Sequence, residues 1–169
     1  MTSLAASIEE AAELIRASRR PWALVGGLAV GALTEPRFTR DVDLAIAVSD
    51  DVQAEALVSR FLAGGFEALA LLEQESTSRL ATVRMRRRST DPTAPVIDLL
   101  FATCGIEAEI VAGARMMEVL PGVSVPVPRV GHLLAMKILA RDDLRRPQDR
   151  GDIAALLAVA DAAERIVVR

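Results

Sequence analysis

Apolar residues follow two different periods along the chain, and each period predicts a different kind of element. Residues 4–19 carry apolar side chains at three- and four-residue spacing, which is the pattern of one face of an α-helix. Residues 41–48 instead alternate between larger apolar side chains and a second set that includes Asp41 and Asp43. Because successive side chains of a strand point to opposite faces, this stretch predicts a half-buried strand with both aspartates on one face.

Similar patterns, together with the glycine and proline positions, divide the whole chain into elements. We expect strands at 22–25, 41–48, 66–73, 79–88 and 96–102, and an extended piece at 123–128. We expect helices at 4–19, 28–33, 50–62, 106–119, 130–143 and 149–164, with Asp50 capping the third. This order indicates an α+β fold, or α/β sandwich, in which helices pack against a mixed sheet. We expect a single domain over residues 1–169 whose C-terminal part, from about residue 130, is helical.

Composition narrows the class of protein. With 169 residues, 51% of them hydrophobic and 25% charged, the sequence favours a globular domain and excludes a disordered chain or a coiled-coil rod. The longest nearly uncharged stretch, residues 22–33, is shorter than the roughly 20 residues that span a bilayer. The N-terminal residues lack a secretory pattern, and the single cysteine, Cys104, forms neither an internal disulfide nor a zinc motif. We therefore expect a cytoplasmic protein with no membrane partner.

Charge adds two observations. The net charge of -3 gives no general attraction to nucleic acid, and an aromatic content of 3% is low for a surface that stacks on bases. Basic residues are almost all arginine, and four of them gather at Arg84, Arg86, Arg87 and Arg88. This cluster either steers a polyanionic acceptor such as tRNA or protects an edge strand from aggregation, and the sequence leaves both open.

Two aspartates on one strand face are the strongest candidate for chemistry. Asp41 and Asp43 are two residues apart, so their Cα atoms lie roughly 6.6 Å from each other. At a separation of about 6 Å and an effective dielectric near 20, two such charges repel by about 2.8 kcal/mol, which a divalent cation would offset. Magnesium takes carboxylate oxygens, and Asp98, set in an apolar strand, is a third candidate ligand or a general base. The alternative is an ordinary solvated sheet face.

A glycine pair precedes these aspartates. Gly26 and Gly27 lie between a predicted strand and a predicted helix, where their small size lets a phosphate approach the free N–H groups of the helix start. A plain tight turn accounts for the glycine pair as well. The order of glycine turn, short helix and Asp-x-Asp strand within 18 residues is what favours a nucleotide site.

The stretch Val25-Gly26-Gly27-Leu28-Ala29-Val30, followed by Arg37-Phe38-Thr39-Arg40-Asp41-Val42-Asp43-Leu44, resembles the signature of minimal nucleotidyltransferases of the polymerase β superfamily, in the branch that includes bacterial AbiEii-type abortive-infection toxins. The resemblance implies a nucleotidyltransferase-type mixed sheet. It implies that Gly26 and Gly27, with Arg37 and Thr39 of the same signature, face the triphosphate. It also implies that Asp41 and Asp43 bind Mg²⁺, with two ions expected.

The same family pattern includes a lysine on a later helix and an acidic residue beyond it. Residues 131–141 and 147–153 resemble these elements, which gives Lys137 a role in holding the triphosphate. Taken alone, Lys137 could equally be a surface lysine extending along an apolar helix. The resemblance leaves the general base open among Asp98, Asp149 and Asp152, and Asp149 also suits a helix cap.

These residues together predict a Mg²⁺-dependent nucleotidyltransferase that moves a nucleoside monophosphate from a nucleoside triphosphate, ATP among them, to an acceptor hydroxyl. The acceptor is an RNA end, a protein or a small molecule, and a cognate antitoxin is a possible partner. The alternative is a catalytically inactive protein of the same fold that binds or regulates. The sequence lacks the His-Asp clusters expected of a phosphohydrolase. We interpret His132 as a helix cap or packing residue rather than a catalyst, and Cys104, with no histidine close in sequence, does not suit a thiol nucleophile.

Overall fold

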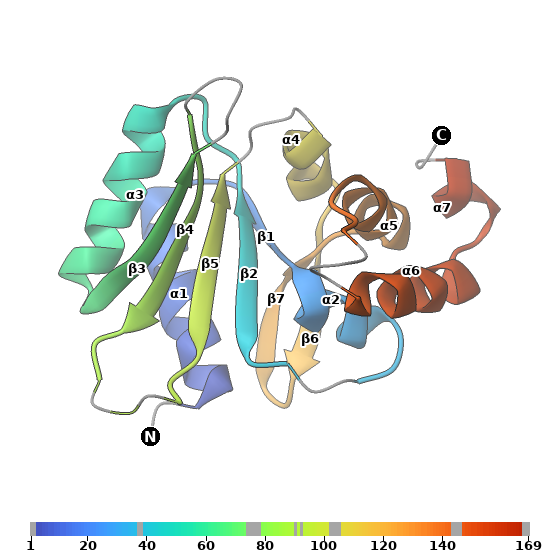
Figure 1. Ribbon diagram of the computed structural model, residues 1–169, viewed down its shortest axis with the longest axis horizontal. Helices are drawn as coiled ribbons and strands as arrows, with labels where there is room; N and C mark the ends of the chain where they lie inside the picture. Colours follow the sequence, from blue (N-terminus) through green and yellow to red (C-terminus); the bar gives the residue numbers. More distant parts are fainter. Residues whose placement is uncertain are drawn as a thin grey trace.

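The computed structural model describes residues 3–36, 39–73, 79–89, 91, 93–101, 106–142 and 147–166. Within these ranges a five-stranded sheet has the order β1-β2-β5-β4-β3, and β6 pairs with β7 in a separate hairpin. Strands β2 and β5 run parallel, whereas the other neighbours in the large sheet are antiparallel. The expected α+β architecture, a mixed sheet with flanking helices, is confirmed (Figure 1).

The elements follow the order expected from the sequence, with one additional strand and one additional helix. The strands are β1 (Trp22–Val25), β2 (Asp41–Ile46), β3 (Phe66–Glu73), β4 (Leu80–Arg87), β5 (Val96–Phe101), β6 (Arg115–Leu120) and β7 (Val123–Val127). The helices are α1 (Leu4–Ser18), α2 (Gly26–Leu33), α3 (Asp51–Ala63), α4 (Ile106–Ala112), α5 (Val130–Leu139), α6 (Gln148–Val159) and α7 (Ala162–Ile166).

The large sheet has one closed face and one more open face. Helices α1 and α3 cover the closed face, and α2, α5 and α6 gather beside β1 and β2 (Figure 1). The closed face is made by every second residue of the central strands, all of them fully buried: Val42, Leu44, Ile46, Val83, Met85, Ile97 and Leu99. The alternate residues of the same strands, including Asp43 and Asp98, therefore lie on the other face.

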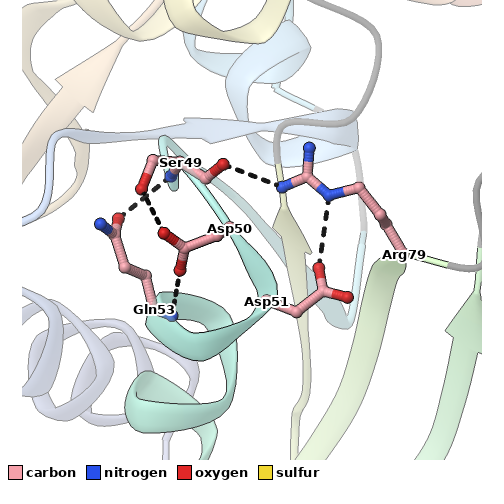
Figure 2. A network of polar contacts seen from close by, with 5 residues as sticks. All are labelled: Ser49, Asp50, Asp51, Gln53 and Arg79. Atoms are coloured by element: carbon pink, nitrogen blue, oxygen red, sulfur yellow. Dashed lines mark hydrogen bonds and ion pairs between the residues drawn. The ribbon is translucent and has the colours of Figure 1, made fainter.

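A hydrogen-bonded cap fixes the turn between β2 and α3 (Figure 2). The Asp50 carboxylate accepts from the backbone N–H of Gln53 at 2.9 Å and from the Ser49 hydroxyl at 2.8 Å, and these bonds lower its pKa. Arg79 crosses from the start of β4 and donates to Asp51 at 3.4 Å and to the carbonyl of Ser49 at 3.3 Å. The capping role expected of Asp50 is confirmed, and it holds the carboxyl end of β2 in place.

The prediction of a helix at 106–119 is wrong for its second half. Helix α4 ends at Ala112, and residues 115–120 form β6, which pairs antiparallel with β7. The helical spacing of apolar residues is outweighed by the turn at 121–122, where Gly122 adopts a φ of 78° and closes a hairpin. The helix expected at 149–164 is likewise two helices, because α6 ends at Val159 and α7 begins at Ala162.

Strand β4 lies between β5 and β3, so the arginine cluster does not sit on an edge strand. The edge-protection hypothesis for this cluster is therefore wrong, since β3 is the strand that forms that edge of the sheet. None of the helices in the described ranges has the length and apolar character of a membrane span.

Candidate active site

The strand register aligns a row of charged side chains across the open face of the sheet. Asp43 of β2 pairs with Asp98 of the parallel strand β5, and Asp98 pairs with Arg84 of β4. Paired residues on neighbouring strands face the same side of a sheet, so these three side chains form one row. At the β1 end of this row, Asp43 pairs with Val25, directly before the glycine turn. The parallel pairing of β2 with β5 therefore places Asp43 and Asp98 side by side.

Arg84 donates two parallel hydrogen bonds to the carboxylate of Asp98. Its Nε donates to one oxygen of Asp98 at 2.8 Å and its second nitrogen to the other oxygen at 2.7 Å. These bonds raise the pKa of Arg84 above its ordinary value, against the effect of burial, and the charges of Asp41 and Asp43 act in the same direction. Sequence reasoning missed this pair, because residues 14 positions apart meet only through the register of β4 with β5.

Gly26 makes room for the carboxylate of Asp43. Helix α2 begins at Gly26, which adopts a φ of 66°, and a Cβ at that position would collide with the Asp43 side chain. Glycine is therefore required here for both backbone and space. Gly27 follows inside the first turn of α2 and is buried. The start of a helix, where backbone N–H groups lack helical partners, thus lies against one of the two strand aspartates.

Lys137 lies between two buried carboxylates rather than at the surface. Its ammonium is 2.8 Å from Asp149 Oδ1 and 2.9 Å from Asp152 Oδ2, both of helix α6. The exposed fractions of these side chains are 16% for Lys137, 2% for Asp149 and 4% for Asp152. The remaining oxygen of Asp149, Oδ2, is buried and has no hydrogen-bond partner among the described residues. This buried acceptor atom is therefore unsatisfied among the described residues.

A cavity of about 430 Å³ joins these groups. Its lining includes five of the residues singled out in the sequence, together with Arg84: Gly26, Asp43, Asp98, Lys137 and Asp149. Within the described ranges, four other candidates for catalysis or nucleotide binding are not among the lining residues: Gly27 is buried in α2, Thr39 is half-buried before β2, Asp41 is exposed at the start of β2, and Asp152 is buried in α6. Arg37 lies outside the described residues, as does Cys104.

The donor set on β2 suits a hard divalent cation. Asp41 and Asp43 present carboxylates from one strand face, and such oxygens are the ligands that Mg²⁺ takes in phosphoryl-transfer sites. Among the described residues, no group of three or more His, Cys, Asp and Glu side chains is close enough to hold a metal. Both oxygens of Asp98 are instead engaged by Arg84. The fit to Mg²⁺ therefore rests on the two aspartates of β2.

The remaining candidates lie away from the cavity or are already paired. His132 is buried in the first turn of α5, with Nε2 at 3.7 Å from Glu109 Oε1, and it is not among the cavity-lining residues. In the arginine cluster, Arg86 contacts Glu67 at 2.9 Å and Arg87 contacts Glu10 at 3.0 Å. These ion pairs reduce the positive charge that the cluster offers to a polyanion.

Residues 13–168 match the model of a family described as nucleotidyl transferase AbiEii toxin, type IV toxin–antitoxin system. A search of curated proteins found no match.

Three solved structures share the fold at low sequence identity. The antibiotic-resistance factor ANT(2'')-Ia is 15% identical, with a TM-score of 0.63 over 97% of this chain and 88% of that one. The lincomycin-bound lincosamide adenylyltransferase LnuA is 11% identical, with a TM-score of 0.56 over 90% and 96%. A nucleotidyltransferase-like protein from Paracoccidioides brasiliensis is 19% identical, with a TM-score of 0.54 over 91% and 78%.

Proposed function

Because the chain belongs to the AbiEii nucleotidyl transferase toxin family, and is thus a nucleotidyltransferase, we propose that it transfers a nucleoside monophosphate to an acceptor hydroxyl with Mg²⁺. The observation that carries this proposal is that Gly26, Asp43 and Asp98 all line one cavity. ATP is the first donor to test. The family also makes a cognate antitoxin a candidate partner.

Asp41 and Asp43 are the residues that we assign to magnesium, with two ions expected. Bound there, Mg²⁺ would neutralise phosphate charge and stabilise the attacking and leaving oxygens. The chain's own contribution is to place the Asp43 carboxylate in the space that a Cβ at position 26 would fill, next to the start of α2. A carboxylate placed there before substrate binds needs little reorganisation.

The triphosphate is assigned to the glycine turn and to Lys137. N–H groups at the start of α2 would donate to phosphate oxygens, and Arg37 and Thr39 remain assigned to the same ligand by family resemblance. Among the described residues, Lys137 directs two of its three donors to Asp149 and Asp152, and we assign its third donor to a phosphate. In the transfer, the acceptor oxygen bonds to the α-phosphorus and the bond from that phosphorus to the leaving pyrophosphate breaks.

Asp149 is the residue that we favour as general base. Asp149 lines the cavity, and its Oδ2 makes no hydrogen bond to the described residues, so this oxygen would accept the proton of the attacking hydroxyl once substrate binding exposes it. Asp98 has both oxygens occupied by Arg84, and Asp152 is not among the residues that line this cavity. Asp98 therefore has a supporting role in this proposal, as the partner that positions Arg84 beside Asp43.

The test is the variant Asp43→Asn, which keeps the size of the side chain and removes its charge. Losing a magnesium ligand costs several kcal/mol of transition-state stabilisation, so we expect transfer from α-labelled ATP to fall by about 10³-fold or more. Calorimetric titration should show weaker Mg²⁺ binding in the same variant. The matched control is Asp91→Asn, which changes a half-buried aspartate in the turn before β5 and keeps the oxygen that accepts from Thr93. Equal activity of Asp43→Asn and wild type contradicts the assignment.

The second candidate is an inactive member of the fold that only binds a partner. If wild-type protein binds neither ATP nor Mg²⁺ in the same titrations, this alternative replaces the proposal. The cavity-lining position of Asp43, Lys137 and Asp149 favours the enzyme, because a protein freed from catalysis has no need to keep buried charges.

A further inference from the structure

A second row of side chains lies next to the charged one, and it is mostly apolar. Two residues further along the strands, Leu100 of β5 pairs with Thr82 of β4, and Thr82 pairs with Leu72 of β3. All three line the same cavity as Asp43 and Asp98, and Met136 of α5 lines it too. The cavity therefore has a charged end at β2 and an apolar end at β3.

Among the described residues, the two cations that line this cavity are each paired with carboxylates. Arg84 is held by Asp98, and Lys137 is held by Asp149 and Asp152. A polyanion binds through cations that exchange its counterions, so paired cations offer little to an RNA phosphate chain. The surroundings of the cavity thus favour an acceptor that has no phosphates of its own.

From this arrangement we infer that the acceptor is a small, uncharged organic molecule with an apolar body and a hydroxyl group. This inference rests on the proposed nucleotidyl transfer. The apolar body lies on the floor made by Leu72, Thr82 and Leu100, and its hydroxyl reaches the charged row. From β5 to β3 this floor spans two strand intervals, about 10 Å at roughly 4.8 Å each, which is enough for the apolar body of a small molecule.

The donor and acceptor occupy opposite ends of the cavity in this arrangement. The glycine turn follows β1, at one edge of the sheet, whereas Leu72 belongs to β3, at the other edge. A triphosphate at the glycine turn therefore leaves the β4 and β3 end for the molecule that receives the nucleotide. The Thr82 hydroxyl supplies one polar contact on an otherwise apolar floor.

Neighbouring leucines on β3 provide a matched pair for the test. The exposed fractions of Leu71 and Leu72 are 63% and 59%, so a charged residue at either position is compatible with folding. Leu72 lines the cavity and pairs with Thr82, whereas Leu71 pairs with Val83, which belongs to the closed face. Variants at Leu71 therefore control for general effects of charge on the edge strand.

The experiment compares full-length wild type with Leu72→Asp, Leu72→Lys, Leu71→Asp and Leu71→Lys. Each protein is incubated with Mg²⁺, α-labelled nucleoside triphosphates and one of three acceptor pools from bacterial cells: an organic-solvent extract, total RNA or total protein. We expect label on a compound of the organic extract. Both Leu72 variants should reduce that labelling by about tenfold or more, because either charge is unfavourable in an apolar contact, while both Leu71 variants stay within about twofold of wild type.

Two outcomes overturn the inference while leaving nucleotidyl transfer intact. Label on RNA or on protein identifies a different acceptor class. If Leu72→Lys labels the acceptor as well as or better than wild type while Leu72→Asp labels it less, the acceptor is a polyanion, since an added cation helps phosphate binding. If wild type labels none of the three pools, the proposed nucleotidyl transfer itself has failed. Thermal unfolding of all five proteins, with midpoints within a few degrees, ensures that the comparison concerns binding.

Discussion

The two faces of the central sheet are built from the same strands but have different roles. On the closed face, Leu44, Ile97 and Leu99 are fully buried under α1 and α3. On the open face, their immediate neighbours Asp43 and Asp98 form a charged row beside a cavity. A shift of one residue along the strand therefore separates the hydrophobic core from the candidate chemistry.

This difference shows how a small chain can hold charges near its core. The closed face supplies apolar burial, at roughly 25 cal/mol per Å² of area removed from water, and the open face is then free to carry unfavourable charge. The carboxylates of the open side are stabilised locally instead, by Arg84 and Lys137. The division predicts that core variants change stability and that open-face variants change activity.

The largest expected loss of stability is an exception to this division, because it comes from a charged residue on the open side. Lys137→Met leaves Asp149 and Asp152 buried without their shared cation, and breaking a buried ion pair costs about 3–5 kcal/mol. We expect urea unfolding to show a loss of this size. Adding Asp149→Asn and Asp152→Asn to the same variant should recover most of it, since no buried charge then remains. A stable single variant contradicts the buried triad.

The next effect sharpens the comparison with two adjacent leucines of β5. Leu99 is fully buried on the closed face, so Leu99→Ala should lose about 3 kcal/mol of unfolding free energy through transfer and cavity terms. Leu100 is only partly buried and lines the cavity of the open face, so Leu100→Ala should lose about 1 kcal/mol. Labelling assays should give the opposite order, with Leu100→Ala the more impaired. Equal losses of stability contradict the assignment of faces.

The third expected effect, smaller than the losses at Lys137 and Leu99, concerns the glycine turn. Gly26→Ala places a side chain at positive φ, which costs about 1–2 kcal/mol, and displaces the Asp43 carboxylate. A displacement of about 1 Å at a reacting centre lowers rates by about 10²-fold, so the loss of transfer should exceed the loss of stability. Paired measurements of denaturation and labelling check this. Full activity in Gly26→Ala contradicts the close approach of Asp43 to the turn.

The parts of the fold that depend on residues close together in the sequence are predictable from the sequence. The shared face of Asp41 and Asp43 follows from strand geometry, and the Asp50 cap follows from a local hydrogen bond. The end of helix α4 is not predictable in this way. Residues 115–120 have apolar positions that suit either period, and pairing with β7 decides between them. The turn at Gly122 is the local signal that favours the hairpin.

The candidate site is predictable in its residues and not in its contacts. The motif on 25–44 identifies Gly26 and Asp43, and the resemblance identifies Lys137. The ion pair between Arg84 and Asp98 depends on the pairing of β4 with β5, which no local pattern specifies. The partners of Lys137 depend on how α5 packs against α6. Contacts between distant segments are therefore what the structure adds.

Lys137 is the single lysine of the sequence, and this makes it a natural reporter for chemical labelling. Reductive methylation with isotope-enriched formaldehyde would mark this side chain and the terminal amine, since arginine does not react. Because two carboxylates enclose the Lys137 ammonium, its methylation rate relative to that of the terminal amine measures how often the contact between α5 and α6 opens.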